Sequence, residues 1–336
     1  MPRGMNQFPH STLGGGVQQV TPAVDRQAPR DRLRVLLSSL PWPVLAAASC
    51  WITKVGLDRG IDGSFIVAAD FLFLAAALVL LERVFPHEEL WQDNDGEVAH
   101  DVVFTLLGSG LPGAIAHALV LAALVGVAEW IARHAGGSVW PVSWPVPAQI
   151  ALVVAIGDFG AYWGHRLFHE IPALWPYHAV HHVVRRLWWM NSGRVHPIDS
   201  FVMIVFSIPL LVLAGAPEDM MVWLAIFTTF VGMLSHCNVE MRCGWLDWIF
   251  NTPGVHRWHH SRVLAEGNHN YGENTMIWDV VFGTHYRQAL RRPPVMVGSE
   301  TTLPTGIGGQ FLEPFRMCRS IVASSFAKSA APQSFG

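Results

Sequence analysis

Histidines are grouped in this sequence at spacings that suit metal binding. Five lie within the stretch from His165 to His182, and three more form a dense group further along. In order, the eight are His165, His169, His178, His181, His182, His256, His259 and His260. Residues three and four apart share one face of a helix, and neutral imidazole is the commonest side-chain metal ligand. The pattern H-x-x-x-H followed by two copies of H-x-x-H-H therefore predicts a metal site built mainly from imidazole.

The remaining histidines do not form such groups. A solitary histidine is usually a surface residue or a hydrogen-bonded core residue. We interpret six in that way: His10, His87, His100, His117, His134 and His285. His196, which precedes Pro197, is either a hydrogen-bonded turn residue, a ligand or a residue that supports a ligand. His269, in the motif NHNYG, is either a ligand or a residue that supports a ligand.

Other motifs accompany the histidine groups over residues 65–290. They are ERVFPHEELW from Glu82 to Trp91, a following Asp101, Asp158-x-x-x-Tyr162 before HRLFH, Arg194-x-His196-Pro197, and NYGENTMIWDVVFGT from Asn270 to Thr284. With the three histidine boxes, these motifs resemble the fatty acid hydroxylase and sterol desaturase superfamily. The resemblance is specific for the superfamily and does not select a substrate.

The resemblance implies an integral membrane enzyme with two non-haem iron ions, which uses O2 to hydroxylate or desaturate a C–H bond of a lipid. It also implies that His236, at the end of an apolar segment, is a ninth ligand. Sterols, fatty acyl chains, sphingoid bases, alkylglycerols and carotenoids all remain open as substrates. We expect electrons from NAD(P)H through a separate partner, either cytochrome b5-like or ferredoxin-like.

Three carboxylates are candidates for holding the ligands in place. Histidine ligands usually donate their second ring N–H to a carboxylate or a carbonyl. Asp158 lies seven residues before His165 within an apolar run, where an ionisable residue is a functional candidate. Its alternative role is a structural hydrogen bond to a neighbouring helix. Glu240, four residues after His236, has the same two interpretations, and Asp279 either orients a histidine or closes the fold.

Other classes of metal protein fit the sequence less well. A haem protein needs histidines facing each other from two spanning helices, and a metal transporter needs ligands near the membrane midplane. These histidines instead follow the ends of apolar runs. A non-catalytic zinc-binding relative is disfavoured because no box has lost a histidine. Imidazole ligands alone also admit zinc, copper or manganese, so the assignment of iron depends on the resemblance.

The composition indicates a membrane protein. Hydrophobic residues make up 51% of the 336 residues and charged residues only 14%, against about 25% charged in soluble proteins. The mean hydropathy is +0.32. A net charge of −3 without a basic stripe excludes a nucleic-acid partner. The four cysteines form no C-x-x-C pair, and we interpret all four as free thiols.

The elements that must position the histidines are apolar helices. Spanning a membrane takes about 20 mostly apolar residues. Candidate runs are 35–55, 64–85, 102–132 with a break near its start, 146–165, and a hairpin of 201–214 and 220–235. Arginines before the first run and after the fourth and sixth runs place every histidine box on the cytoplasmic side.

These observations predict an all-α, polytopic membrane protein with a cytoplasmic helical histidine-box domain. We divide the chain into a disordered arm at 1–33, a membrane-embedded domain at 34–290 with its metal site in 158–285, and an extended or disordered tail at 291–336. The arm and tail are rich in glycine, proline and small polar residues.

Overall fold

The computed structural model describes residues 32–288 and 291–330. The described residues are helical, with three isolated β-bridges and no strand. The predicted all-α class is therefore confirmed. The predicted N-terminal arm, apart from its last two residues, lies outside the described residues.

Within the described residues, six helical segments are long and apolar enough to cross a membrane. They are Val35–Asp58, Gly63–Val84, Val98–Ala135, Val146–Glu170, Pro197–Ala214 and Glu218–His236. The first consists of α1 (Arg32–Ser39) and α2 (Pro41–Asp58), and the second is α3 (Gly63–Val84). The third combines α4 (Val98–Phe104), the π-helical turn η2 (Thr105–Gly110) and α5 (Leu111–Ala135). The multi-pass prediction agrees with these spans.

The hairpin is also present. It consists of α8 (Pro197–Ser207), α9 (Pro209–Ala214) and α10 (Glu218–His236), and α6 (Val146–Glu170) packs against α8. A Cβ at Gly160 of α6 would lie 1.9 Å from Phe206 O, so only glycine permits this close packing. The predicted break in the third run is the π turn, where a Cβ at Gly108 would lie 1.9 Å from Val195 O.

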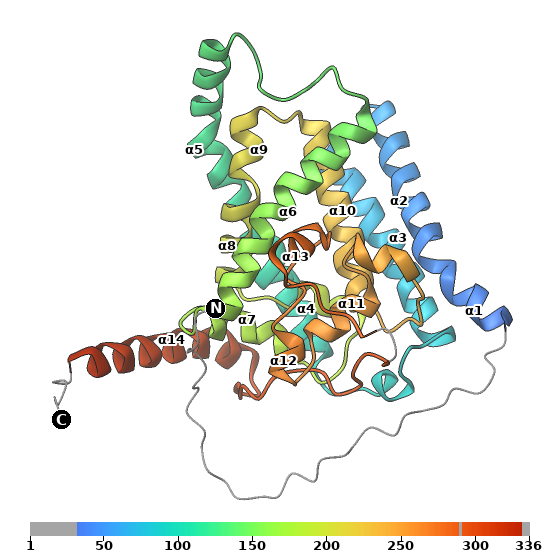
Figure 1. The fold of residues 1–336 in the computed structure, drawn as a ribbon, viewed down its shortest axis with the longest axis vertical. Coiled ribbons are helices and arrows are strands. Elements are labelled where there is room, and N and C mark those ends of the chain that lie inside the picture. Colours follow the sequence, from blue (N-terminus) through green and yellow to red (C-terminus); the bar gives the residue numbers. More distant parts are fainter. Residues whose placement is uncertain (1–31, 289–290, 331–336) are drawn as a thin grey trace, which may run out of the picture.

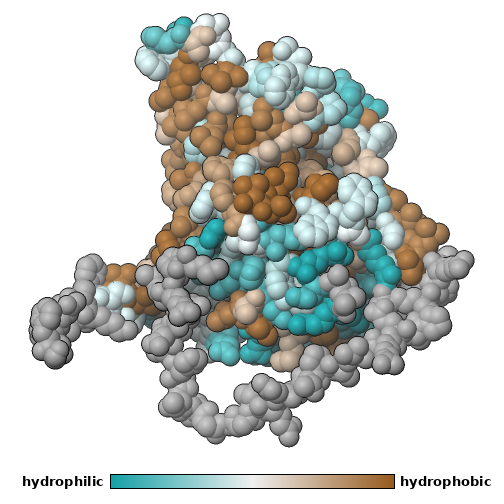
Figure 2. Space-filling view, in the orientation of Figure 1, coloured by the Kyte–Doolittle hydropathy of each residue, from teal (hydrophilic) through white to brown (hydrophobic). Residues whose placement is uncertain are grey.

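The histidine boxes lie at one end of the bundle. Short elements cluster there below the upright helices (Figure 1). They are η1 (Glu89–Gln92), α7 (Trp175–His182), η3 (Trp189–Gly193), η4 (Gly244–Trp248), α11 (Pro253–His259), α12 (Leu264–Gly267) and α13 (Ile277–Phe282). Figure 2 shows an apolar surface over the upright helices and a hydrophilic surface at the end with the short elements. The bundle therefore has an apolar side surface and one polar end, and the histidine boxes lie at that polar end.

The prediction of an extended or disordered C-terminal tail is wrong for most of its length. Residues Ile307–Ala330 form the helix α14, which contains Pro314. Tertiary contacts explain the difference: Phe311 stacks on Phe104 with ring centroids 4.2 Å apart, and Phe315 packs edge-on against Tyr177 of α7. Packing of these aromatic rings against the bundle outweighs the weak helix propensity of the glycines and serines.

Candidate metal centre

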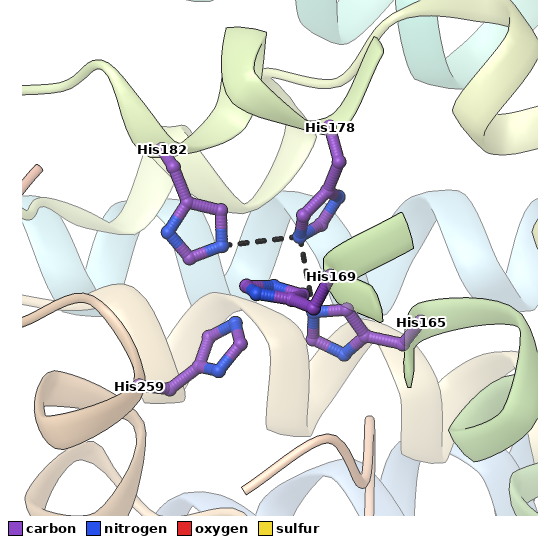
Figure 3. Close-up of side chains that lie close together, drawn as sticks. All are labelled: His165, His169, His178, His182 and His259. Carbon is purple, nitrogen blue, oxygen red and sulfur yellow. Dashed lines mark hydrogen bonds between the residues drawn. The ribbon is translucent and has the colours of Figure 1, made fainter. Parts of the chain in front are cut away.

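The structure gathers all nine predicted ligands into two adjoining groups. The first cluster contains His165, His169, His178, His182 and His259, and the second contains His181, His236, His256 and His260. Within each cluster the candidate ligand atoms all lie within 4.8 Å of one another. Figure 3 shows the five rings of the first cluster directed toward a common centre. The clusters meet where the rings of His182 and His260 stack with centroids 4.4 Å apart.

Each H-x-x-H-H box contributes to both clusters. On α7, His178 and His182 belong to the first cluster, whereas His181 belongs to the second. The box at the end of α11 has the opposite arrangement: His256 and His260 belong to the second cluster, whereas His259 belongs to the first. The last two histidines of each box are adjacent in sequence and point about 100° apart around the helix, so they enter different clusters. Two boxes of the same spacing therefore build two sites.

The spacing of the ring nitrogens fits ligands around one ion. In the first cluster, His178 Nε2 lies 3.0 Å from His165 Nε2 and 3.1 Å from His182 Nε2. In the second cluster, His236 Nε2 lies 3.1 Å from His181 Nε2 and 3.0 Å from His256 Nε2. Two nitrogens bound at right angles, each about 2.1 Å from a metal, stand about 3.0 Å apart. The donor atoms thus have metal-site geometry.

Main-chain carbonyls hold several of these rings by their other nitrogen. His165 Nδ1 lies 2.9 Å from Tyr271 O, and His259 Nδ1 lies 2.8 Å from the carbonyl of His269. His236 Nδ1 lies 2.9 Å from Gly232 O, one turn earlier on α10. A carbonyl only accepts, so each Nδ1 carries the proton and each Nε2 keeps its lone pair for a metal. The backbone therefore sets the tautomer that binding requires.

Side chains also contact the ring nitrogens of three histidines. The sequence did not identify Asp199, the carboxylate that makes the shortest of these contacts. Asp199 Oδ2 lies 2.7 Å from His178 Nδ1, and both side chains are buried. Glu273 Oε1 lies 3.2 Å from His165 Nδ1, and Asn268 Oδ1 lies 3.3 Å from His169 Nδ1. Asp199 follows the Arg194-x-His196-Pro197 motif by two residues, and Glu273 lies inside NYGEN. The position of each carboxylate in or beside a family motif was the sequence feature that could have identified it as a partner of a histidine ligand.

Burial keeps the rings neutral. It lowers the pKa of His178, His182, His256 and His260 well below 6.5, and neighbouring imidazoles lower it further. Burial also lowers the pKa of His259 to about 4. Only neutral imidazole has a free lone pair, so these histidines are ready to bind metal at neutral pH.

Two predicted supporting carboxylates act on a loop instead of on histidine rings. The oxygens of Asp158 accept hydrogen bonds from the main-chain N–H groups of Asn274 and Thr275. Asp279 accepts from the N–H groups of Tyr271 and Gly272. The prediction that either one directly orients a histidine is therefore corrected. Both clamp the loop whose carbonyl at Tyr271 holds His165.

The other three predicted supporting residues have different positions. Glu240 lies outside both clusters, where its Oε2 is 2.6 Å from His87 Nδ1. The His196 ring accepts from Ile198 N at the start of α8 and lies outside both clusters, as expected for a hydrogen-bonded turn residue. His269 contributes its main-chain carbonyl to the site, while its ring packs on Tyr286.

The solitary histidines are also outside the two clusters. This holds for His87, His100, His117, His134 and His285 among the described residues. His10 lies outside the part of the chain that the structure describes.

Comparisons with known proteins agree with the site. The fatty acid hydroxylase family model matches residues 150–284, which contain all nine histidines. The ornithine lipid hydroxylase OlsE of Rhizobium tropici is 38% identical over 297 residues, covering 84% of this chain and 86% of that protein. No solved structure matches the chain.

Two more distant relatives match a smaller part. Alkylglycerol monooxygenase of Xenopus tropicalis is 32% identical over 38% of this chain and 28% of its own length. Methylsterol monooxygenase 2-2 of Arabidopsis thaliana is 30% identical over 42% of this chain and 54% of its own length. The family-model match and the extensive similarity to the ornithine lipid hydroxylase show that the chain belongs to the fatty acid hydroxylase and sterol desaturase superfamily.

Proposed function

We propose that each histidine cluster holds one iron ion and that the protein uses O2 to hydroxylate a membrane lipid. The observation that carries this proposal is the division of nine histidines into two groups with ligand spacing. The family supports the reaction class, since the relatives are lipid hydroxylases and monooxygenases. The protein is accordingly an oxygen-dependent lipid hydroxylase, and the iron count is our proposal.

A redox metal is required by this chemistry. Zinc has no redox change, so it does not activate O2. Iron bound to imidazole supplies the one-electron and oxygen chemistry that attack on an unactivated C–H bond needs. One oxygen atom enters the C–H bond and the other leaves as water, so each turnover consumes two electrons and two protons. We propose that these electrons come from NAD(P)H through a separate cytochrome b5-like or ferredoxin-like donor.

The chain's own residues orient the ligands and exclude water. Asp199 accepts the Nδ1 proton of His178, which makes that ring a stronger donor at Nε2. Phe168 stacks over His178 with centroids 5.5 Å apart, and Tyr271 packs edge-on against His165. The aromatic surround lowers the local polarity. Reactive oxygen chemistry is thereby kept away from bulk solvent.

Ornithine lipid is the substrate that we propose first. The relative with matching length, at 86% coverage, is an ornithine lipid hydroxylase. The other relatives act on alkylglycerols and methylsterols, by their names, and match only 38% and 42% of this chain. The much greater coverage by the ornithine lipid hydroxylase, 84% of this chain, therefore favours an ornithine lipid over the other two classes.

Mass spectrometry of lipid extracts tests this function. Cells that make ornithine lipid without hydroxylating it should accumulate a product with one more oxygen atom when they express the protein. Cells that express His178→Ala should not. If the wild type leaves ornithine lipid unchanged but oxidises another lipid class, the substrate proposal fails while the hydroxylase activity stands. A product lacking two hydrogens would identify a desaturase.

We further propose that the histidine end faces the cytoplasm. Arg185, Arg186 and Arg262 lie at this end, while Arg59 and Arg133 lie near the opposite ends of the spans. Excess basic residues mark cytoplasmic loops. Cysteines introduced at Arg185 and Arg262, both exposed, should react only from the cytoplasmic side. A cysteine at Trp144, between α5 and α6, should react only from outside, and the reverse pattern would overturn the orientation.

A further inference from the structure

The C-terminal helix α14 has an apolar stripe that the rest of the described chain leaves open. Leu312, Phe315 and Val322 are 59%, 44% and 38% exposed. Their spacings of three and seven residues place them on one side of the helix. Figure 2 shows apolar surface on the part of α14 that stands clear of the bundle. This exposed apolar side needs an occupant.

The composition of α14 suits a membrane surface and not a membrane crossing. The helix has 24 residues but is absent from the six apolar segments. Arg316 and Arg319 are exposed beside Leu312, four and seven residues further along the helix, at one edge of this apolar side. An amphipathic helix with basic residues beside its apolar face lies in the membrane interface, and anionic headgroups strengthen its binding. Long arginine side chains keep their charge in water while their stems cover apolar surface.

Contacts at the start of α14 place it at the membrane boundary. Phe311 stacks on Phe104, which lies near the beginning of the third span. The carbonyl of Phe311 lies 3.0 Å from Nε2 of His196, the residue before the fifth span. Figure 1 shows that α14 runs at a steep angle to the upright helices and extends away from the bundle, beside the end that holds the short elements. The helix is thus fixed at the depth where two spans begin.

We propose that α14 lies in the plane of the bilayer interface, on the leaflet nearest the histidine clusters. Leu312, Phe315 and Val322 enter the acyl boundary, and Arg316 and Arg319 contact anionic lipid headgroups. Phe315 also packs on Tyr177 of α7, the helix that carries three of the histidines. The bilayer therefore helps to hold α7 at a fixed depth.

Depth-dependent fluorescence quenching tests this placement in the full-length protein. The background is Cys50→Ser with Cys318→Ser, because the other two cysteines are buried. Single fluorophores are placed through Leu312→Cys and Val322→Cys, with the matched control Ser324→Cys at an exposed position on the opposite side of the same helix. The protein is reconstituted in nanodiscs of phosphatidylcholine and phosphatidylglycerol, and quenching by lipid-attached nitroxide is compared with quenching by aqueous iodide.

Labels at Leu312 and Val322 should be quenched several-fold more by the lipid nitroxide than the label at Ser324, with the opposite order for iodide. Arg316→Ala with Arg319→Ala should reduce the difference only when phosphatidylglycerol is present. Equal quenching at all three positions would overturn the proposal. So would protection of Leu312 from both quenchers, because that result would identify a protein partner as the occupant. Neither outcome bears on lipid hydroxylation.

Discussion

The two histidine clusters differ in what supports them. In the first cluster, carboxyl side chains stand behind two rings: Asp199 behind His178 and Glu273 behind His165. Burial raises the pKa of Glu273 to about 8, so Asp199 is the main source of negative charge. In the second cluster, the described contacts are neutral: Gly232 O and Arg194 O accept from ring nitrogens, and the Asn251 amide lies 3.1 Å from His256 Nδ1. His260 Nδ1 is buried without a partner in the described residues. Imidazole ligands thus have carboxyl partners in the first cluster and neutral partners in the second.

This difference has chemical consequences for a bound metal. A carboxylate that accepts a ring proton raises the basicity of the opposite nitrogen and tunes the metal. The first cluster also contains His169, which is only partly buried, while every histidine of the second is buried. We infer that the first cluster is the more electron-rich and accessible site. The second is the more enclosed.

Loss of one ligand from either cluster should have the largest effect. We expect His178→Ala and His256→Ala each to reduce lipid hydroxylation more than about 100-fold, because removal even of an outer partner costs about 10–100-fold. The double variant should be no worse than either single variant, since both clusters are needed. His134→Ala, an exposed residue on α5, is the control. If one of the two single variants kept its hydroxylation activity, only the cluster altered in the other variant would be needed for catalysis.

Removal of the carboxylate behind His178 should have the next largest effect. Asp199→Asn keeps the shape but weakens the hydrogen bond at 2.7 Å. We expect hydroxylation or iron affinity to fall about 10–100-fold, with iron lost first from the first cluster. Asp219→Asn, at the exposed start of α10, should leave both unchanged. If Asp199→Asn behaves like its control, the electrostatic contrast between the clusters is unimportant.

Acid should destabilise the metal-free protein. His259 has a pKa of about 4 when folded, against 6.5 as the ordinary value. The unfolded chain binds this proton more readily, so stability is complete above about pH 6.5 and falls as the pH drops toward 4. A single such histidine contributes about 1.4 kcal/mol per pH unit in that window. Thermal unfolding of chelator-treated protein measures the slope, and a flat profile between pH 7 and 4 would contradict burial of the neutral rings.

The smallest effect is expected in the second cluster. Ser235 Oγ lies 3.0 Å from His236 Nδ1, but Gly232 O lies slightly closer to the same nitrogen. Ser235→Ala should therefore cost no more than about 1 kcal/mol, seen as a few-fold decrease in hydroxylation. A loss as large as that of Asp199→Asn would show that both clusters depend equally on side-chain support.

Local patterns predicted the helices and the ligands well. Apolar runs indicated all six spans, and spacing within the boxes indicated eight histidines that the structure brings together. The exchange of residues between clusters was not predictable, because it depends on how α7 and α11 face each other. Asp199 was missed for the same reason: it lies 21 positions from His178, and only the turn into α8 brings them together.

Composition alone does not predict structure where tertiary contacts stabilise a segment. Glycine and proline suggested an extended tail, yet stacking of Phe311 on Phe104 stabilises α14. Asp158 and Asp279 each had two interpretations, and their hydrogen bonds favour the structural one, since both hold the loop from Tyr271 to Thr275. The roles of the nine ligands remain predictions, now with a geometry that a metal analysis can test.

Iron content per chain tests the two-site account most directly. Protein purified in mild detergent from iron-supplied cells is analysed by elemental analysis together with Mössbauer spectroscopy. The account predicts two iron ions in the wild type, and about one in each of His178→Ala and His256→Ala with different spectra for the ion that remains. One iron ion or none in the fully active wild type would contradict it.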